Sequence, residues 1–565
     1  MKRRIFALLL VVAMLCPMIL TGCGGKNSSD TGDSATKETA PREAVSITMW
    51  VVTDKNTTEA AKAAVEEEFN KITKSTFTTY VDLVFVTPEE YETKLNQKFA
   101  QIENMGGSND DVVDDEFVVD GGDAAVTKPT TEAELETNEF GVTVLKYPEI
   151  LENQVDIVFI DGFDMLYNLA TAGKLQNLNS YINDTGASKI LNGVIPSQLF
   201  TYSKINKVTY GIPNNRVIGE YTYLLVKKDV VTGDANGDGV ISGDEMNGSY
   251  YNFNEIADIF DCEKVIEYIK NNRTDLIPVL SSFDNPYIHN WTNKKDDSFS
   301  ILGSSLRKEG GNLGFDNIFE VDDFTKFELL MKKLEVGSYF ATDVETAKKN
   351  QNFGVAVLKG DSTVIDEYGD NYYIKVVKNP TLTDDNVFGT FYGVTTYSKN
   401  VARAMEIITM LNTNSELRNV LQYGVEGVHY ELDENDRVDR FNNDYIMDIN
   451  NTGNVFIAYP EEDMDDEVWD RGIKTNLDVK LSKTIGIWAT WANVNASYLN
   501  DLDVISQTYK QRMDACETVE QLAAFFETAK AEVAALNEFV AATNAETADT
   551  PLAVYTAWLA SKNNK

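Results

Sequence analysis

Oxygen-bearing side chains recur at a fixed spacing between residues 234 and 245. Asp, Asn and Asp stand at positions 1, 3 and 5 of this stretch, a glycine at position 6 permits a sharp turn, and Glu ends it at position 12. With a main-chain carbonyl at position 7 and a hydroxyl at position 9, this is the oxygen ligand set of an EF-hand-like calcium loop. The spacing therefore predicts a Ca²⁺ site formed by Asp234, Asn236, Asp238, Val240, Ser242 and Glu245.

The segments beside this loop differ from those of a calcium sensor. A predicted strand precedes the loop, and Gly248 soon interrupts the segment that should form the exiting helix. Because a sensor works by opening a pair of helices, we expect the ion to be structural. The alternative is an acidic surface turn that holds no metal.

The N-terminus carries a second chemical motif. Lys2, Arg3 and Arg4 precede an apolar run over residues 5–20, and Leu-Thr-Gly follows up to Cys23. A short apolar run with basic residues before it and small residues at its end is typical of a secretory signal. The ending resembles the lipobox of bacterial lipoproteins, in which the cysteine is acylated on sulfur. This resemblance implies that Cys23 begins the mature chain and that lipid holds it on the outer face of the cell membrane. The alternative is a plain secretory signal with an incidental cysteine.

Polar and aromatic residues follow two predicted strands. Trp50 and Asp54 lie at the end of the first strand, and Asp161 and Asp164 follow a later one. Ligands of parallel sheets bind at the carboxyl ends of strands. Flat aromatic rings pack on the C–H faces of sugars, and carboxylates accept hydrogen bonds from their hydroxyls. These residues favour a sugar over a peptide or an ion, although each is also compatible with a structural role.

Alternating strands and helices must position these side chains. Residues 45–52 and 80–86 are predicted strands, and residues 57–72 and 88–103 are predicted helices. This order predicts a largely parallel sheet covered by helices, and hence an α/β fold. Residues 154–160 form a further buried strand, and the chain after Asn500 is mostly helical.

Two stretches lack apolar periodicity. Residues 23–44 are rich in small and polar residues and are expected to form a flexible tether. Residues 106–140 hold eleven acidic residues and one lysine, which predicts a solvated acidic insertion. Calcium binding by this insertion is the alternative, but no ligand spacing recurs in it.

Composition narrows the function classes. A chain of 565 residues suggests two or three domains. Its net charge of −39 becomes −42 once three basic residues leave with the signal, which argues against nucleic acid or anionic lipid as the main partner. Cys262 and Cys516 are too few for a disulfide framework, and His289 and His429 are too few for a His-rich zinc site.

Several landmarks occur in an order that resembles the family 1, sugar-type extracellular solute-binding proteins of ATP-driven (ABC) importers. The segment 419–430 is similar to one common in the lipoprotein branch found in Firmicutes. The other landmarks are Asp156-Ile-Val-Phe-Ile followed by Gly173-Lys-Leu-Gln-Asn-Leu178, Tyr210-Gly-Ile-Pro213 followed by Tyr223-Leu-Leu-Val-Lys-Lys-Asp229, and Tyr397-Ser-Lys-Asn400.

This resemblance implies a two-lobed, periplasmic-binding-protein-like (type II) fold with hinge crossovers and a helical C-terminal region. Lobe 1 would take residues 45–207 and a returning piece at 341–392. Lobe 2 would take residues 208–340 and 393–565. A ligand would lie between the lobes and favour their closure.

The resemblance also places crossovers at residues 211–223 and 389–396, where more polar and aromatic residues gather. Trp291 and Trp491 are further candidates, although indoles are more often packing residues. The full set of expected ligand contacts is Trp50, Asp54, Asp161, Asn214, Asn215, Arg216, Tyr221, Phe391, Tyr392 and Trp488.

The resemblance implies a receptor without catalytic activity, which captures a carbohydrate, expected to be an oligosaccharide, and delivers it to the membrane subunits of the importer. We expect it to act as a monomer. The alternatives are a receptor of the same fold for a peptide or metal chelate, a surface glycoside hydrolase with paired carboxylates, and a structural surface protein. The sequence contains no nucleophile elbow, metalloprotease helix or P-loop.

Overall fold

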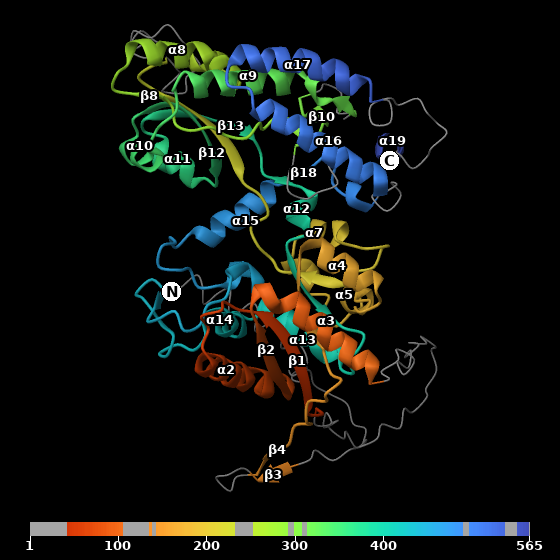
Figure 1. The fold of residues 1–565 in the computed structure, drawn as a ribbon. Coiled ribbons are helices and arrows are strands. Elements are labelled where there is room, and N and C mark those ends of the chain that lie inside the picture. Colours follow the sequence, from red (N-terminus) through yellow and green to blue (C-terminus); the bar gives the residue numbers. More distant parts are fainter. Residues whose placement is uncertain are drawn as a thin grey trace, which may run out of the picture. The chain divides into compact units, whose positions relative to one another are not determined.

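A computed structural model describes residues 42–105, 135–137, 143–231, 252–291, 299–307, 314–489, 496–536 and 551–563. From Ala44 onward the chain forms one compact unit. Two separate sheets organise this unit, and helices pack on both (Figure 1).

The first sheet has the strand order β2-β1-β5-β15-β6. Its strands are β1 (Val45–Val52), β2 (Thr79–Val86), β5 (Ile157–Asp161), β6 (Gly211–Pro213) and β15 (Thr390–Val394). The first three are mutually parallel, whereas β15 is antiparallel to β5 and pairs Thr390 with Asp161. The ends of β1 and β5 and the start of β15 therefore lie at one edge of the sheet.

Helices cover this sheet because their apolar residues recur at helical spacing. In α2 (Glu59–Phe77), Val65, Phe69 and Ile72 are buried, and the Thr58 side chain caps the helix by accepting from the Ala61 N–H at 3.2 Å. The other long helices on this sheet are α3 (Pro88–Asn104), α4 (Gly162–Thr171), α13 (Val401–Thr413) and α14 (Ser415–Tyr423).

The second sheet has the order β13-β7-β12-β8. It comprises β7 (Tyr221–Lys227), β8 (Ile277–Val279), β12 (Phe353–Gly360) and β13 (Tyr372–Lys378). Alternate residues of β7 enter two different clusters: Leu224 packs with residues of α8 (Glu263–Asn272) and α9 (Asp322–Val336), and Leu225 packs with Phe353 and Tyr372.

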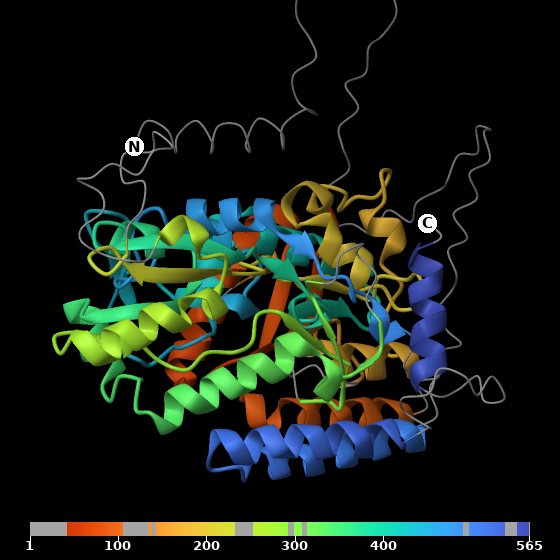
Figure 2. The same ribbon diagram turned by 90° about the horizontal axis from the view of Figure 1, so that it is seen from above.

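A third cluster joins the C-terminal helices to three short strands. It contains residues of α16 (Ala496–Asp514), α17 (Val519–Ala534) and α19 (Pro551–Asn563) with residues beside β9 (Ile288–Asn290), β10 (Leu302–Ser305) and β11 (Asp316–Asn317). Helix α17 contacts α9, and the two lie side by side in Figures 1 and 2.

The remaining elements are short. They are β3 (Leu135–Thr137), β4 (Thr143–Leu145), α5 (Asn179–Ile182), α6 (Leu191–Val194), α7 (Ser197–Tyr202), α10 (Val344–Asn350), α11 (Thr363–Tyr368), β14 (Thr381–Leu382), α12 (Asp384–Val387), β16 (Tyr430–Leu432), β17 (Val438–Arg440), α15 (Val468–Asp478), β18 (Lys480–Leu481) and 3₁₀ turns at Phe253–Glu255, Ile259–Cys262, Ile318–Glu320, Ile449–Asn451 and Val455–Ile457.

Three segments lie together where the chain passes between the sheets. Residues 214–220 link β6 to β7, and residues 379–389 link β13 to β15. Residues 476–482 bind both, because Asn476 donates to the Arg216 carbonyl at 2.8 Å and the Lys480 N–H donates to the Pro380 carbonyl at 2.8 Å. The expected crossover at 389–396 is thus wrong in position: residues 390–394 form β15, which is buried within the first sheet.

Strand pairing also differs from the expected division into lobes. Residues 353–378 were expected in lobe 1, but β12 and β13 pair with β7 in the second sheet. Residues 401–423 were expected in lobe 2, but α13 contacts β15 and α14 contacts α2, both of the first sheet. The expected division came from the resemblance, and apolar patterns in the sequence do not name the partner of each strand. The exact lobe boundaries stay a prediction.

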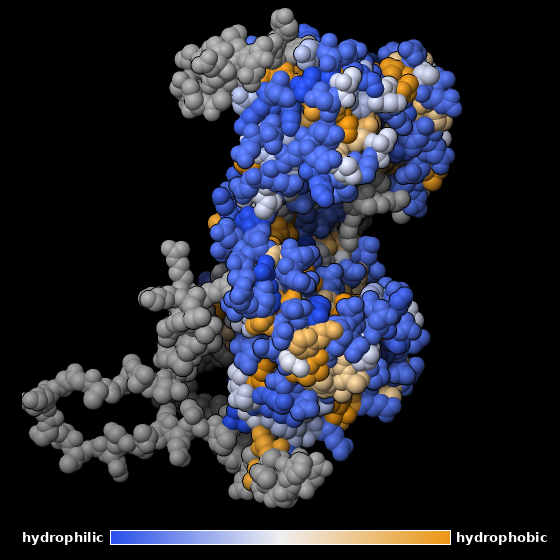
Figure 3. All heavy atoms as spheres, turned by 90° about the vertical axis from the view of Figure 1, so that its left-hand side faces the viewer, coloured by the Kyte–Doolittle hydropathy of each residue, from blue (hydrophilic) through white to orange (hydrophobic). Residues whose placement is uncertain are grey.

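The surface agrees with the acidic composition. On the face shown in Figure 3, hydrophilic residues dominate and hydrophobic residues form small groups. Within the described ranges, no helix has both the length and the apolarity that a membrane span needs.

Candidate ligand-binding site

A cavity of about 490 Å³ lies at the edge of the first sheet where β1 and β5 end. Val52 ends β1, Asp161 ends β5 and Thr390 begins the antiparallel β15. Ligands of open α/β sheets bind at this edge, and the volume lies within the range of small-molecule sites. The lining residues are Val52, Pro88, Tyr91, Glu92, Phe159, Asp161, Asp164, Met165, Thr390, Asp448, Asn450 and Asn451.

Two aromatic residues of the sheet core, Tyr91 and Phe159, border the cavity, and each is only 3% exposed. The rings of Tyr91 and Phe159 meet edge to face with centroids 5.8 Å apart. The Tyr91 hydroxyl accepts from the Phe159 N–H at 2.8 Å and donates to the Trp50 carbonyl at 3.3 Å, so it ties α3 to both β1 and β5. Burial raises the pKa of Tyr91 well above its usual range, which keeps the hydroxyl neutral and able to donate. The Tyr91 ring is therefore held rigidly.

Carboxylates provide most of the polar lining. Glu92, Asp161, Asp164 and Asp448 are all exposed. Asp161 precedes Gly162, whose φ of 72° turns the chain directly from β5 into α4, and Asp164 lies in the first turn of that helix. Their carboxylate oxygens are suited to accept hydrogen bonds from ligand hydroxyls.

The loop 447–452 completes the cavity, and side chains from other elements hold its backbone. Four backbone carbonyls of the loop accept hydrogen bonds from side chains of other elements. Gln422 Nε2 donates to Met447 at 2.6 Å, Arg418 Nη2 to Ile449 at 2.8 Å, Thr390 Oγ1 to Asn450 at 2.8 Å and Tyr392 Oη to Asn451 at 2.7 Å.

Arg418 is the charged member of this set. It is fully buried, and burial lowers the pKa of its guanidinium to about 10, so it still carries its charge at neutral pH. It forms no ion pair with a carboxylate among the described residues.

The expected contacts near the crossover hold the structure together. Asn214 donates to Thr390 Oγ1 at 2.9 Å, and Asn215 donates to Asn454 Oδ1 at 3.1 Å. Arg216 donates to the Asn386 carbonyl at 2.5 Å, and burial lowers the pKa of its guanidinium. The Tyr221 hydroxyl bonds to the Asp478 carboxylate, and burial raises the pKa of Tyr221 to about 12. None of the four expected contacts lines the cavity.

The other expected contacts also lie outside the cavity lining. Trp50, Phe391 and Tyr392 belong to the core of the first sheet. Trp488 packs edge to face on Phe163 and Phe388, with its indole N–H donating to the Tyr202 carbonyl at 3.2 Å. Asp54 accepts from the Asn56 N–H at 2.8 Å in the turn after β1. Trp291 is buried and stacks on Phe315 with centroids 4.0 Å apart.

The cavity therefore joins Asp161 and Asp164 with residues that sequence reasoning missed. Tyr91 and Glu92 follow β2 at the start of α3, so the strand-end rule that selected Asp161 applies to them too. Asp448, Asn450 and Asn451 give no such signal, because they reach the cavity from a distant loop.

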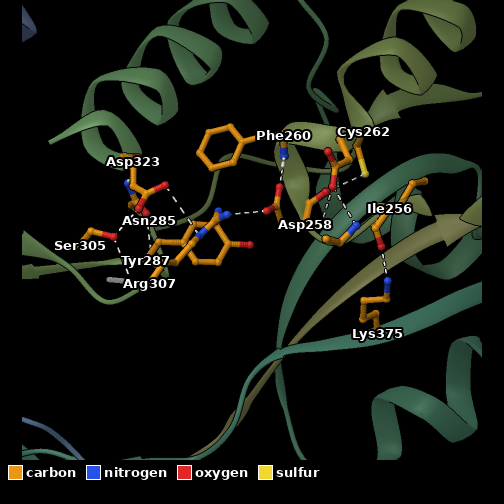
Figure 4. A network of polar contacts seen from close by, with 12 residues as sticks. Ile256, Asp258, Phe260, Cys262, Asn285, Tyr287, Ser305, Arg307, Asp323 and Lys375 are labelled. Carbon is orange, nitrogen blue, oxygen red and sulfur yellow. Dashed lines mark hydrogen bonds and ion pairs between the residues drawn. The ribbon is translucent and has the colours of Figure 1, made fainter. Parts of the chain in front are cut away.

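A second polar cluster, near α8 and β13, is structural (Figure 4). The Arg307 guanidinium lies 3.6 Å from the centre of the Tyr287 ring and donates to Asp258 at 2.7 Å. Cys262 is buried nearby, and burial raises the pKa of its thiol, which makes the thiolate scarce. Cys262 and Cys516 are both free.

The two histidines are not ligand contacts in the described cavity. Burial lowers the pKa of His289 to about 4, and its ring meets Trp291 edge to face at 5.0 Å. His429 is buried and accepts from the Val425 N–H at 2.9 Å through Nδ1.

Several expectations lie outside the described residues. These are the calcium loop 234–245, the lipidation site Cys23, Trp491 and all of the acidic segment 106–140 except β3. Within the described ranges, no group of three His, Cys, Asp or Glu side chains is arranged to hold a metal ion.

Comparisons with known proteins place this geometry in context. No family model matches the chain. Over 281 residues, 45% of this chain, it is 25% identical to a carbohydrate ABC transporter substrate-binding protein from Streptococcus pneumoniae. The alignment spans 54% of that relative, so the chain spans about half the length of the curated relative it matches.

A solved structure resembles the chain over most of its length. The N-glycan transport solute binding protein NgtS from Streptococcus pneumoniae aligns with a TM-score of 0.55 and 17% identity, covering 93% of this chain and all of that one. At this identity the likeness concerns the fold. The chain therefore has the two-domain, periplasmic-binding-protein-like α/β fold of a solute-binding protein.

Proposed function

We propose that this chain is an extracellular solute-binding receptor of an ABC importer, and that it captures an oligosaccharide in the cavity at the edge of the first sheet. The observation that carries the proposal is the polar part of the cavity lining: four exposed carboxylates and the amide side chains of Asn450 and Asn451. These acceptors and amide donors suit the hydroxyls of a sugar, whereas Tyr91 and Phe159 are each only 3% exposed and offer little ring surface. The 25% identical relative, a carbohydrate ABC transporter substrate-binding protein, supports the carbohydrate and the importer.

The direct test is binding of sugars to the full chain. We would record thermal melting and calorimetric titrations with maltotetraose, cellotetraose, mannotetraose and chitotetraose. One sugar class should raise the melting temperature saturably, because a ligand that binds only the folded state stabilises it. Chromatography of the same mixtures should show no product. Product formation would favour the hydrolase, and no response to any sugar would favour a peptide or another solute.

Variants tie the binding to this cavity. Asp161→Ala should lower the affinity for the sugar identified in the panel by about tenfold, in keeping with loss of hydrogen bonds to a charged group. The melting temperature without sugar should stay unchanged, because Asp161 is exposed. Asp184→Ala is the matched control, since Asp184 is exposed and does not line the cavity. Equal affinities for Asp161→Ala and the unaltered chain would place the sugar elsewhere.

We further propose that lipid on Cys23 anchors the chain at the outer face of the membrane, where it would meet the membrane subunits of the importer. The support is the apolar run followed by Leu-Thr-Gly-Cys. Labelled palmitate should enter the intact chain and not Cys23→Ser, which should be released into the medium. Retention of Cys23→Ser at the membrane would contradict the anchor.

We also propose that residues 234–245 bind one structural Ca²⁺ ion. Its support is the agreement of every ligand position with the twelve-residue pattern. Calcium should raise the melting temperature of the full chain relative to chelator, and Glu245→Gln should remove most of that rise by taking away the bidentate ligand. Asp184→Asn should retain it. An identical melting curve with calcium and with chelator would exclude the site.

A further inference from the structure

The lining of the cavity carries negative charge and no positive charge. Four of its side chains are carboxylates, and it contains no lysine, arginine or histidine. In the part of the chain that the structure describes, none of the four forms an ion pair. They are Glu92, Asp161, Asp164 and Asp448. Asp448 only accepts from the Asn450 N–H, at 2.8 Å.

Cations beside the cavity form contacts of their own. Lys174 lines an adjoining cavity with Glu92, but it bonds to the Glu103 carboxylate and to the Tyr397 hydroxyl, the latter at 2.9 Å. Arg418 lies behind the loop 447–452, fully buried. Its Nη2 donates to the Ile449 carbonyl and its Nη1 to Asn419 Oδ1 at 3.2 Å, while its Nε has no hydrogen-bond partner among the described residues.

Arg440 borders the far side of the same loop. It lies 3.5 Å from the Glu461 carboxylate and does not line the cavity. Lys174 and Arg440 therefore each have a carboxylate partner, whereas Arg418 is held only by neutral acceptors behind the loop. Against this one buried cation, the four unpaired carboxylates leave the cavity with a net negative charge.

We propose that this cavity selects its sugar by charge: it takes neutral hexose units, binds protonated amino sugars more tightly, and rejects uronates and other anionic sugars. This inference rests on the proposed function. A carboxylate on the sugar would lose its hydration on entering the cavity. It would then lie beside four like charges without gaining a cationic partner. A neutral hydroxyl instead donates to these carboxylates, and an ammonium group adds charge to the same hydrogen bond.

The size of the effect follows from Coulomb's law. Two like charges 4 Å apart repel by about fivefold in affinity in bulk water and by much more where the effective dielectric constant is lower. Against several carboxylates in a partly enclosed cavity, we expect a penalty of about ten- to a hundredfold for a uronate. Added salt should reduce this discrimination, because the carboxylates are exposed to solvent.

The experiment compares three forms of one sugar on the full chain. The tetrasaccharide that binds most tightly in the neutral panel is oxidised at its primary alcohols to give the uronate form. An amino-sugar tetrasaccharide with the same glycosidic linkage is also prepared. Calorimetric titration at low salt should rank amino above neutral above uronate, with the uronate about ten- to a hundredfold weaker than the neutral sugar.

Matched variants assign the discrimination to the cavity. Asp164→Asn should narrow the gap between neutral and uronate sugars, since it removes one repelling charge and keeps the side-chain shape. Asp184→Asn changes the net charge equally on an exposed residue outside the lining and should leave the gap unchanged. Equal narrowing by both variants would assign the effect to overall charge and overturn the proposal.

The outcomes separate this inference from the proposed function. If neutral sugars bind and their uronates bind equally well or better, selection by charge is wrong and the sugar receptor stands. If only anionic sugars bind, the proposed preference for neutral and amino sugars is wrong. If no sugar of any charge binds, the proposed function falls and this inference falls with it.

Discussion

Arg418 is a fully buried, charged side chain that donates a hydrogen bond to the backbone of the loop 447–452. Its guanidinium reaches the Ile449 carbonyl, next to the residues that line the cavity. Burying a cation without a carboxylate costs free energy, so this arginine contributes little net stability. Its contribution is to the position of the loop that carries Asp448 and Asn450.

We therefore predict that Arg418→Met loosens the loop more than it destabilises the fold. The Ile449 carbonyl loses its donor, which costs about 1–3 kcal/mol, while removal of the buried charge offsets much of that cost. Hydrogen exchange of the Asn450 and Asn451 amides should accelerate, and sugar affinity should fall, with little change in melting temperature.

Arg418→Lys should restore part of the affinity, because an ammonium group can donate to the same carbonyl. If amide exchange in residues 448–452 stays unchanged in Arg418→Met, the arginine does not position the loop.

His289 provides a prediction about pH. Burial lowers the pKa of its imidazole to about 4, below the unfolded value of about 6.5, so the unfolded chain binds this proton more readily. The stability from neutral His289 is fully present above pH ~6.5 and is lost as the pH falls through about 4. The expected loss is about 3 kcal/mol over that window. In His289→Gln, the free energy of unfolding measured with urea should fall less between these pH values than it does in the unaltered chain. Equal slopes would show that His289 is hydrated in the folded state.

At the residue scale, position along a strand indicated the edge of the sheet. Asp161 was selected because it follows a buried strand, and it lines the cavity, so its contact with a ligand stays a prediction. Trp50 and Tyr392 lie in strands of the same sheet but belong to its core. Whether an aromatic residue binds a ligand or fills the core depends on which face and edge of the sheet it meets. A linear pattern does not contain that information.

At the scale of elements, local signals predicted the opening of the chain well. The predicted strands 45–52 and 80–86 correspond to β1 and β2, and the predicted helices 57–72 and 88–103 correspond to α2 and α3. Pairing was harder: the resemblance placed residues 341–392 in lobe 1, whereas β12 within them pairs with β7 of the second sheet. The pairing of β12 with β7 depends on interactions between residues more than a hundred positions apart in the sequence.

Contacts between helices also create a titratable group. Glu328 of α9 is half-buried near Lys510 and Asp514 of α16, and this partial burial raises its pKa to about 7. Its folded pKa exceeds the unfolded value of about 4.3, so the protonated form favours folding. This stability is fully present below pH ~4.3 and is lost as the pH rises through about 7.

We predict that Glu328→Gln is more stable than the unaltered chain at pH ~8, by up to about 3 kcal/mol, and equally stable at pH ~4. Glutamine keeps the shape of the protonated side chain without the charge. Chemical unfolding at both pH values measures the difference. Glu335→Gln, on an exposed residue of the same helix, should show no such gain. A loss of stability in Glu328→Gln at pH ~8 would mean that the ionised carboxylate is stabilised by its cationic neighbours.

At the scale of the whole molecule, the last helix completes a cluster that begins far earlier in the chain. Tyr555 of α19 stacks on Phe315 with centroids 5.0 Å apart and on Trp291 at 5.9 Å. These residues belong to a different cluster from the core beneath the cavity, which lies in the first sheet. Stability and binding should therefore be separable in this molecule.

We predict that Tyr555→Ala lowers the free energy of unfolding by about 3–5 kcal/mol and leaves sugar affinity unchanged. The lost ring removes buried area and two stacking contacts from the C-terminal cluster, whereas Trp291 and Phe315 are not among the residues that line the cavity. Urea unfolding followed by tryptophan fluorescence measures the first effect, and calorimetric titration at low temperature, where the variant stays folded, measures the second. Thr556→Ala, on an exposed residue of the same helix, should change neither. A fall in affinity that accompanies the loss of stability would show instead that the C-terminal helices and the first sheet act as one unit in binding, and that the cavity depends on the whole chain.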